Sequence, residues 1–161
     1  MALHPTKNDL SEDIRTKAAA LLTARLADAL DLASQTKQAH WNVKGSNFIA
    51  LHELFDDIHE DVGNYVDDIA ERAVMLGAQV AGTIRAAAAA TKLPEYPLGI
   101  TCGKEHVAAL STALAAFGKL ARKAIDEAAA FGDADTADLF TGVSRGIDKW
   151  LWMVEAHAQN S

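Results

Sequence analysis

The sequence predicts an all-α protein in which four long helices form a bundle, with a short helix in the long crossover between helices two and three. Half of its 161 residues are apolar, alanine is abundant and only 3 residues are proline, a composition that favours helices. Apolar residues recur at the three- and four-residue spacing of amphipathic helices in four long segments. Glycine follows three of these segments, as it often follows helices.

The first long segment is predicted to form a helix from residue 12 to residue 43. Ser11 suits the N-cap, neither glycine nor proline interrupts the segment, and Gly45 suits the C-terminal cap. Only a few residues connect it to the next segment, so the two helices should form an antiparallel hairpin. Its predicted core-facing side chains are Ile14, Ala18, Leu21, Leu22, Leu26, Leu30 and Ala33.

The second long segment, residues 46–76, has the clearest helical pattern and contains no proline and one glycine, Gly63. Apolar side chains recur every seven residues, and others follow three places later, which is the spacing of a helix face packed against a core. Gly77 should end this helix. The predicted core face comprises Phe48, Leu51, Phe55, Ile58, Val62, Tyr65, Ile69 and Leu76.

The remaining half of the chain contains the crossover and two further helices. Residues 78–102 hold two prolines and two glycines around an alanine-rich segment, Thr83 to Ala90, which is long enough for one short helix. A crossover of this length can run along the whole bundle, so helices two and three can be parallel. The third helix is predicted at 104–131 and closed by Gly132. Either Asp133 or Asp135 then caps the fourth helix.

The length fits one domain, with residues 1–10 as a short flexible tail and residues 11–161 as the folded part. A net charge of −7 argues against binding of nucleic acid or membranes through bulk electrostatics. The single cysteine, Cys102, excludes an internal disulfide and fits a reducing compartment, although its reactivity stays open. No stretch is long and apolar enough for a membrane span or a signal peptide, so a cytoplasmic protein is expected.

The second helix should also carry a metal site. It has eight carboxylates between Gly45 and Glu71 and no lysine or arginine, whereas a solvated face usually mixes both charges. His52 and Asp56 are four residues apart and can share an ion, as can Asp67 and Glu71. The two pairs are fifteen residues apart, roughly 22 Å along a helix, so one chain cannot close both on one ion.

A second, antiparallel copy of the helix could complete each pair. A two-fold axis near residues 61 and 62 would set His52 and Asp56 of one chain against Asp67 and Glu71 of the other. Gly63 lies close to this axis and would let the helices approach closely. The spacing therefore predicts two identical shared sites in each dimer.

The hairpin adds a third ligand from the same chain, because His40 should lie level with His52. Either histidine alone could be a structural, hydrogen-bonded residue, but together with Asp56 they favour a metal site. Two imidazoles and three carboxylates suit Fe(II), Mn(II) or Zn(II). Trp41 can be an ordinary core aromatic residue, or it can donate an electron to a neighbouring redox metal.

We interpret two further groups of carboxylates as candidate cation sites. The acidic face of the second helix could collect ferric ions and seed a mineral, through Glu53, Asp57, Glu60 and Asp61. Three carboxylates near the joint of helices three and four could line a cation entrance: Asp126, Asp135 and Asp138. Helix capping and ordinary solvation explain these residues nearly as well.

At the level of motifs, the chain resembles the Dps proteins, the mini-ferritins named as DNA-binding proteins from starved cells. The similarity runs from about Ser11 to Ala156 and is carried by the runs KQAHWNVKGSNFIALHELFD, DDIAERAVMLG, TADLF and DKWLW. It implies a ferritin-like bundle assembled as a hollow homo-dodecamer from two-fold dimers. It also implies ferroxidase sites at the two-fold interfaces, which oxidise Fe(II) with hydrogen peroxide or oxygen, and ferric mineral stored inside. By position, His40, His52 and Asp56 of one subunit and Asp67 and Glu71 of its mate match the family's ligands, and Trp41 matches the tryptophan beside them.

The chain departs from DNA-condensing members of this family in its tails. Tail-mediated DNA binding needs several basic residues, but the N-terminal tail offers Lys7 alone and the C-terminal EAHAQNS offers no lysine or arginine. DNA binding is therefore expected to be weak or absent. Two alternatives stay open: a nucleoid-compacting protein with secondary ferroxidase activity, and a structural dimer seam that holds Zn(II) without Fe(II) turnover.

Overall fold

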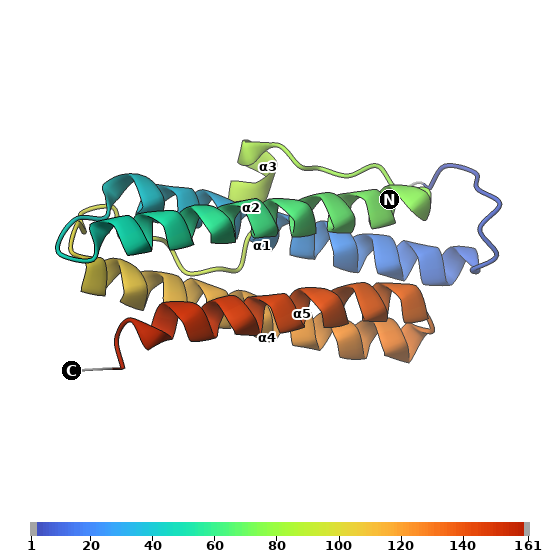
Figure 1. Ribbon diagram of the computed structural model, residues 1–161. Helices are drawn as coiled ribbons and strands as arrows, with labels where there is room; N and C mark the ends of the chain where they lie inside the picture. The colour runs from blue at the N-terminus through green and yellow to red at the C-terminus, as the bar shows by residue number, and fades with distance from the viewer. Residues whose placement is uncertain (1–2, 160–161) are drawn as a thin grey trace.

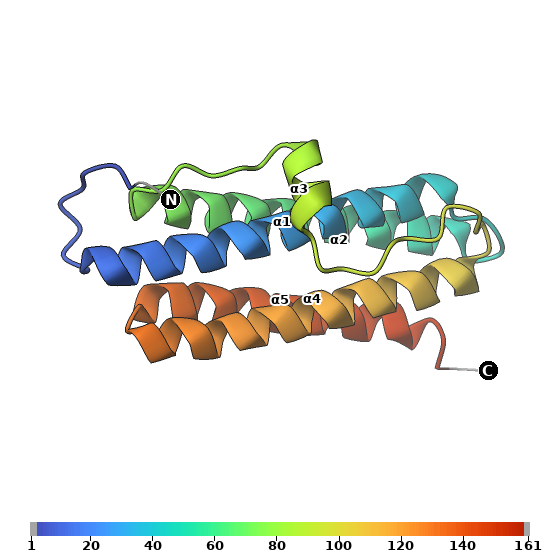
Figure 2. The same cartoon turned by 180° about the vertical axis from the view of Figure 1, so that it is seen from behind.

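The computed structural model describes residues 3–159, which contain five helices: α1 (Glu12–Asn42), α2 (Phe48–Met75), α3 (Ile84–Ala90), α4 (Gly103–Phe131) and α5 (Ala134–Ala156). The four long helices lie in two layers, α1 beside α2 and α4 beside α5 (Figure 1). The short α3 packs on α1, on the side away from α4 and α5 (Figure 2). The crossover makes α2 and α4 parallel, so the predicted bundle is confirmed. Within residues 3–159, no helix is long and apolar enough for a membrane span.

Local hydrogen bonds explain where the helices begin and end. The Ser11 hydroxyl accepts from the Ile14 amide, and the Asp133 carboxylate accepts from the Thr136 amide, so Asp133 and not Asp135 caps α5. Gly132 has a φ of 89°, a left-handed conformation that glycine adopts without a steric penalty, and it ends α4. The helix ends predicted from capping residues lie within two residues of those observed.

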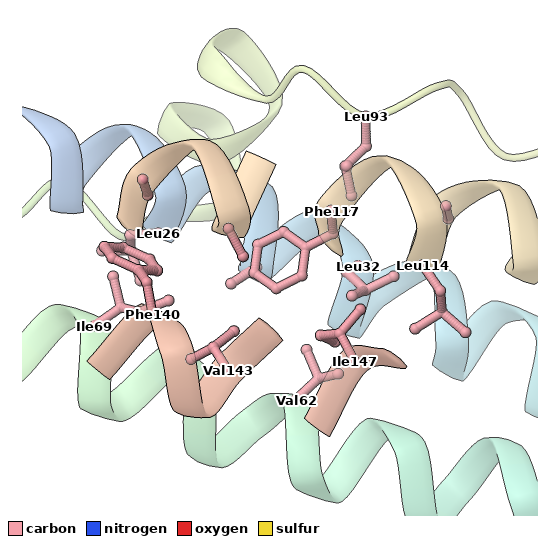
Figure 3. Close-up of a cluster of buried hydrophobic side chains, with 14 of the residues drawn as sticks. Leu26, Leu32, Val62, Ile69, Leu93, Leu114, Phe117, Phe140, Val143 and Ile147 are labelled. Carbon is pink, nitrogen blue, oxygen red and sulfur yellow. The ribbon is translucent and has the colours of Figure 1, made fainter. Parts of the chain in front are cut away.

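The core lies between the two layers, where aromatic and branched side chains of all four long helices meet (Figure 3). Phe117 of α4 and Phe140 of α5 are fully buried there, against aliphatic residues of α1 and α2. Most of the predicted core face of α2 is buried as expected, but Phe48 is 39% exposed and Tyr65 is only partly buried. Six of the eight residues predicted for the core face of α2 are therefore buried.

The burial pattern of α1 differs from the prediction. Ile14, Leu30 and Ala33 are only partly buried, whereas Leu32 and the polar Asp28 are completely buried. The reason is that α1 contacts α2, α4 and α3, so it is covered on more than one side. A single apolar stripe cannot describe a helix that is covered in this way.

Buried polar contacts hold the crossover on α1. Asp28 accepts a hydrogen bond of 2.7 Å from the Lys92 amide and lies 2.8 Å from the Nε atom of Arg25. The Thr91 hydroxyl donates to Asp31 at 2.8 Å, and the Gln35 amide donates to the Pro94 carbonyl. A buried carboxylate without such partners would be costly, so these contacts explain why Asp28 sits on the covered side of α1.

Residues 3–10, predicted as a flexible tail, make specific contacts with the end of the α1–α2 hairpin. The His4 amide donates to the Gly77 carbonyl at 2.7 Å, and Leu3 and Leu10 pack against the core. The Arg15 guanidinium donates to the carbonyls of Leu10 and Leu76. These contacts hold the two ends of the segment 3–10 against the bundle, while residues 1 and 2 of the predicted tail lie outside the described residues.

A buried histidine predicts a measurable pH dependence of stability. His106 is 1% exposed, its Nδ1 atom lies 2.7 Å from the Tyr96 hydroxyl, and burial lowers its pKa. As the pH falls below about 6.5, His106 binds a proton in the unfolded chain more readily than in the folded chain. Neutral His106 therefore contributes fully to the stability of the fold above about pH 6.5, and this contribution declines as the pH falls. We expect a slope of up to about 1.4 kcal/mol per pH unit.

Thermal unfolding between pH 5 and pH 8 tests this expectation. The midpoint should fall more steeply on acidification in the natural chain than in His106→Gln. His157→Gln, which changes an exposed histidine at the end of α5, serves as the control and should keep the natural profile. Identical profiles for the natural chain and His106→Gln would rule out this origin.

Candidate metal centre

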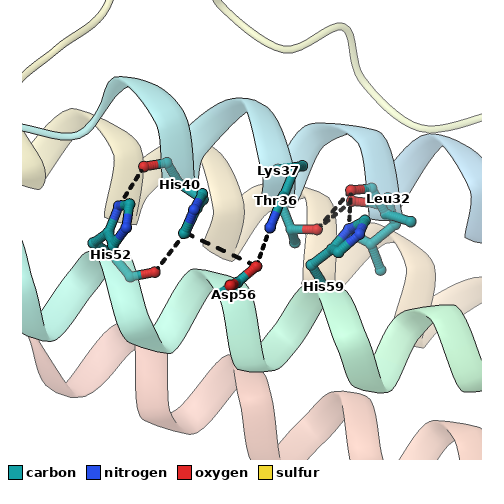
Figure 4. A network of polar contacts seen from close by, with 8 residues as sticks. Leu32, Thr36, Lys37, His40, His52, Asp56 and His59 are labelled. Atoms are coloured by element: carbon teal, nitrogen blue, oxygen red, sulfur yellow. Dashed lines mark hydrogen bonds and ion pairs between the residues drawn. The ribbon is translucent and has the colours of Figure 1, made fainter.

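His40 of α1 and His52 of α2 form a pair next to the hairpin turn. Their rings stack with centroids 3.7 Å apart. The Nδ1 atom of His40 lies 2.8 Å from the His52 carbonyl oxygen, and the Nδ1 atom of His52 lies 2.9 Å from the His40 carbonyl oxygen (Figure 4). Because a carbonyl only accepts, both Nδ1 atoms carry the hydrogen and donate it. Each Nε2 atom then keeps its lone pair, which is the tautomer that binds a metal.

Asp56 lies one helical turn after His52 and close to the same pair. Its Oδ1 atom is 4.0 Å from the Nδ1 atom of His40, and its carboxylate forms a close ion pair with Lys37 of α1 (Figure 4). The hydrogen bond from Lys37 lowers the pKa of Asp56, partial burial opposes this effect, and His40 adds a smaller lowering. Asp56 is therefore ionised at neutral pH and already has a cationic partner.

The structure thus brings three of the five predicted ligands to one place without closing a site. Within residues 3–159, no group of three or more His, Cys, Asp or Glu side chains is arranged to hold a metal ion. The carboxylate of Asp56 is engaged by Lys37, and the remaining two predicted ligands, Asp67 and Glu71, are exposed further along α2. Neither of those two makes a hydrogen bond or ion pair of its own among residues 3–159.

Sequence reasoning missed two residues at this place. Lys37 precedes His40 by three residues, so both lie on one face of α1, and this spacing could have indicated a competing cation. His59, three residues after Asp56, donates from Nδ1 to the Ala33 carbonyl at 2.9 Å. Its Nε2 atom therefore also keeps a lone pair.

The Lys37–Asp56 ion pair gives a prediction for metal affinity. A divalent ion must displace the Lys37 ammonium from Asp56 and is repelled by it. We expect Lys37→Gln to bind Zn(II) about tenfold more tightly than the natural chain. This factor corresponds to the repulsion between charges of +1 and +2 that lie about 5 Å apart in water. Isothermal titration calorimetry measures this, with Lys17→Gln, which removes an exposed lysine paired with Asp13, as the control. Unchanged or weaker binding by Lys37→Gln would contradict the role given to Lys37.

Several large apolar side chains on α2 and beside His40 are exposed in the monomer. Trp41, next to His40, is 67% exposed and so does not belong to the core. At the start of α2, Phe48 and Ile49 are 39% and 60% exposed, and at its end Val74 and Met75 are 54% and 58% exposed. Solvent-exposed apolar residues at both ends of one helix indicate a surface that another molecule covers.

The remaining predicted site residues fall into two groups. On α2, Glu53, Asp57 and Glu60 are exposed, whereas Asp61 accepts hydrogen bonds from the Tyr65 hydroxyl and the Trp150 indole nitrogen. At the joint of α4 and α5, the three predicted entrance residues Asp126, Asp135 and Asp138 are all exposed. Asp135 lies 3.7 Å from the guanidinium of Arg72.

Comparison with known proteins identifies relatives over the whole bundle. The profile of the ferritin-like domain matches residues 19–161. The chain is 45% identical to the DNA protection during starvation protein of Agrobacterium fabrum over 159 residues, which cover 99% of this chain and 98% of that protein.

Solved structures agree with this match. DpsC from Streptomyces coelicolor superposes with a TM-score of 0.94 at 27% identity, covering 99% of this chain and 94% of that one. Dps from Microbacterium arborescens in the high iron form has a TM-score of 0.86 at 32% identity, covering 92% of this chain and 96% of that one. Both matches therefore include the hairpin that carries His40 and His52.

Proposed function

Because this chain belongs to the Dps family of ferritin-like proteins, we propose that it oxidises Fe(II) with hydrogen peroxide or oxygen and stores the ferric product. The observation that carries this proposal is the histidine pair. Both rings are fixed by reciprocal hydrogen bonds in the tautomer that leaves Nε2 free, which is how proteins prepare imidazoles for a metal. A merely structural histidine pair has no need to keep both Nε2 lone pairs available.

The site is completed by a second subunit in this proposal. His52 and Glu71 are symmetric about the midpoint between Asp61 and Val62, and so are Asp56 and Asp67. A two-fold axis at this midpoint would make α2 pair with its antiparallel copy and bring histidine and carboxylate ligands together.

The exposed apolar residues of α2 follow the same symmetry. Phe48 is related to Met75, and Ile49 to Val74, by the same midpoint that relates the ligand pairs. An antiparallel dimer would therefore cover all four exposed side chains while it joined the ligands. This agreement is independent of the ligands, since it rests on apolar residues, and it supports the shared site.

The residues present suit iron as the substrate. Two imidazoles and three carboxylates form a hard to borderline donor set, and the anionic oxygens favour Fe(III) over Fe(II). Oxidation by peroxide balances when two Fe(II) ions each lose one electron and hydrogen peroxide takes up both electrons with two protons to give two water molecules. Zn(II) and Mn(II) should occupy the same donors as substitutes. Trp41, exposed beside His40, could supply a further electron.

Storage requires a closed assembly, which we propose to be a homo-dodecamer of two-fold dimers. Glu53, Asp57 and Glu60 would seed the mineral, because their carboxylates are exposed on a part of α2 that has no lysine or arginine before Arg72. Asp61 would assist through Oδ1, since both of its hydrogen bonds reach Oδ2. Ferrous ions would enter past the exposed carboxylates at the joint of α4 and α5, namely Asp126, Asp135 and Asp138.

DNA would be protected by iron chemistry more than by binding. The tails carry few basic residues, and the net charge of −7 repels phosphate. A plasmid exposed to Fe(II) and hydrogen peroxide at physiological salt tests this distinction in one gel. The protein should prevent nicking without retarding the plasmid. Retardation that resists salt would favour the alternative of a nucleoid-compacting protein, and nicking at the rate of the protein-free sample would refute the ferroxidase proposal.

A further inference from the structure

A tyrosine and a tryptophan from different helices share one carboxylate oxygen near the middle of α2. The Tyr65 hydroxyl donates to Oδ2 of Asp61 at 2.7 Å, and the Nε1 atom of Trp150 donates to the same Oδ2 at 2.6 Å. Tyr65 and Asp61 lie one turn apart on α2, whereas Trp150 comes from α5. All three side chains are partly buried, so this cluster lies where the two helices meet.

Packing fixes the phenol of Tyr65 in this position. A Cβ atom at position 146 would lie 1.9 Å from the Tyr65 hydroxyl oxygen, so only glycine leaves room for the ring against α5. The phenolic proton therefore lies in the hydrogen bond to Asp61, where it can pass to the carboxylate as an electron leaves the ring.

We propose that Trp150 and Tyr65 form a one-electron relay, with Asp61 as their common proton acceptor, that removes strong one-electron oxidants from the protein. The physiological oxidant would be the hydroxyl radical formed when Fe(II) reacts with peroxide. The source of the oxidant is the only part of the proposal that rests on the proposed function. Indoles and phenols are the side chains that give up an electron to such radicals most readily. A hydrogen bond to an anionic base assists both, because the base takes the proton as the electron leaves.

The first step oxidises Trp150. One electron passes from the indole to the hydroxyl radical, which becomes hydroxide, and the Nε1 proton passes to Oδ2 of Asp61. The products are a neutral indolyl radical and a protonated Asp61. No second proton acceptor is needed, because the 2.6 Å hydrogen bond already joins the two atoms.

The second step moves the radical to Tyr65. One electron passes from the phenol to the indolyl radical, Asp61 returns its proton to Nε1, and the phenolic proton moves to Asp61. Trp150 is then restored, Tyr65 is a phenoxyl radical and Asp61 again carries one proton. The step is downhill, because an indolyl radical is a stronger one-electron oxidant than a phenoxyl radical.

The same contacts could serve only to clamp α5 onto α2, and the test must separate the two roles. The chain has only 3 tryptophans and 2 tyrosines. A background variant with Trp41→Phe, Trp152→Phe and Tyr96→Phe therefore keeps one indole and one phenol, Trp150 and Tyr65. Pulse radiolysis of this iron-free protein with azide, whose radical takes one electron from indoles and becomes azide ion, starts the relay without any ferroxidase activity.

In the background variant, the green absorption of the indolyl radical should decay as the sharp violet band of the phenoxyl radical rises. Both changes should share one first-order rate constant that does not depend on protein concentration. Asp61→Asn in this background should slow the transfer at least about tenfold, since a neutral amide replaces the anionic base. Tyr65→Phe should abolish the violet band and leave the indolyl radical to decay slowly.

The proposal is overturned if the background variant forms no coupled phenoxyl radical, or if Asp61→Asn leaves the rate constant unchanged. A second variant keeps Tyr96 and carries Tyr65→Phe instead, and a phenoxyl yield there equal to that of the background would equally refute the special role of Tyr65. Far-ultraviolet circular dichroism of each variant verifies the helical fold. Where Asp61→Asn fails to fold, the background variant in heavy water replaces it, and a rate unchanged from light water would overturn coupled proton transfer.

Discussion

Equal mixtures of two impaired chains are expected to regain about one quarter of the natural rate of Fe(II) oxidation. One chain carries His40→Ala and His52→Ala, and the other carries Asp67→Ala and Glu71→Ala. Each alone should be slower than the natural chain by at least about 10- to 100-fold, the loss that removal of even an outer metal partner can cause. The reason is that every site would lack either both imidazoles or both distal carboxylates.

The expected recovery follows from the symmetry of the dimer. Random association makes half of the dimers mixed. In a mixed dimer, one of the two sites combines the intact imidazoles with the intact carboxylates. About one quarter of all sites are therefore intact. Mixing two differently tagged preparations of the His40→Ala, His52→Ala chain is the matched control and should recover nothing. Native mass spectrometry verifies that mixed assemblies have formed. Absence of recovery in verified mixtures would refute a site shared across the two-fold axis.

The fold was predictable where one face of a helix meets the core. The core face of α2 follows from its seven-residue repeat, and the cap Ser11 follows from local hydrogen bonding that short sequences encode. At α5 the sequence left Asp133 and Asp135 both possible, and the structure identifies Asp133. Asp28 shows where this reasoning stops. Its burial depends on Lys92 and Arg25, and a contact between α1 and a distant crossover leaves no periodic trace in either segment.

The candidate site was predictable for a similar reason and to a similar extent. His40 and His52 were expected to lie level because a short turn fixes the register of a hairpin, and the structure brings their rings into contact. The ion pair of Asp56 with Lys37 was not expected, since it depends on side-chain conformations across two helices. Asp61 was expected on an open acidic face, but its partner Trp150 lies 89 positions later in the sequence.

The joint between α4 and α5 is expected to be the most sensitive polar position for stability. Asp133 is 1% exposed, accepts hydrogen bonds from the amide and hydroxyl of Thr136, and forms a 2.7 Å ion pair with Arg72. Asp133→Ala removes the N-cap of α5 and leaves the Arg72 guanidinium, which is 12% exposed, with only the longer 3.7 Å contact to the exposed Asp135. We expect a loss of about 3–5 kcal/mol in the free energy of unfolding, as for other broken buried ion pairs.

Chemical denaturation at one fixed protein concentration measures this loss, since assembly also contributes to the apparent stability. Asp135→Ala is the matched control, because this carboxylate is two residues away and 83% exposed, and it should change the free energy of unfolding by less than about 1 kcal/mol. Asp133→Asn should fall between the two, because its side-chain oxygen still caps α5 while the charge is lost. Equal losses for Asp133→Ala and Asp135→Ala would show that the buried ion pair does not hold the joint. If Asp133→Ala lost several kcal/mol in the free energy of unfolding and Asp133→Asn lost none, the stability of the joint would come from the cap alone.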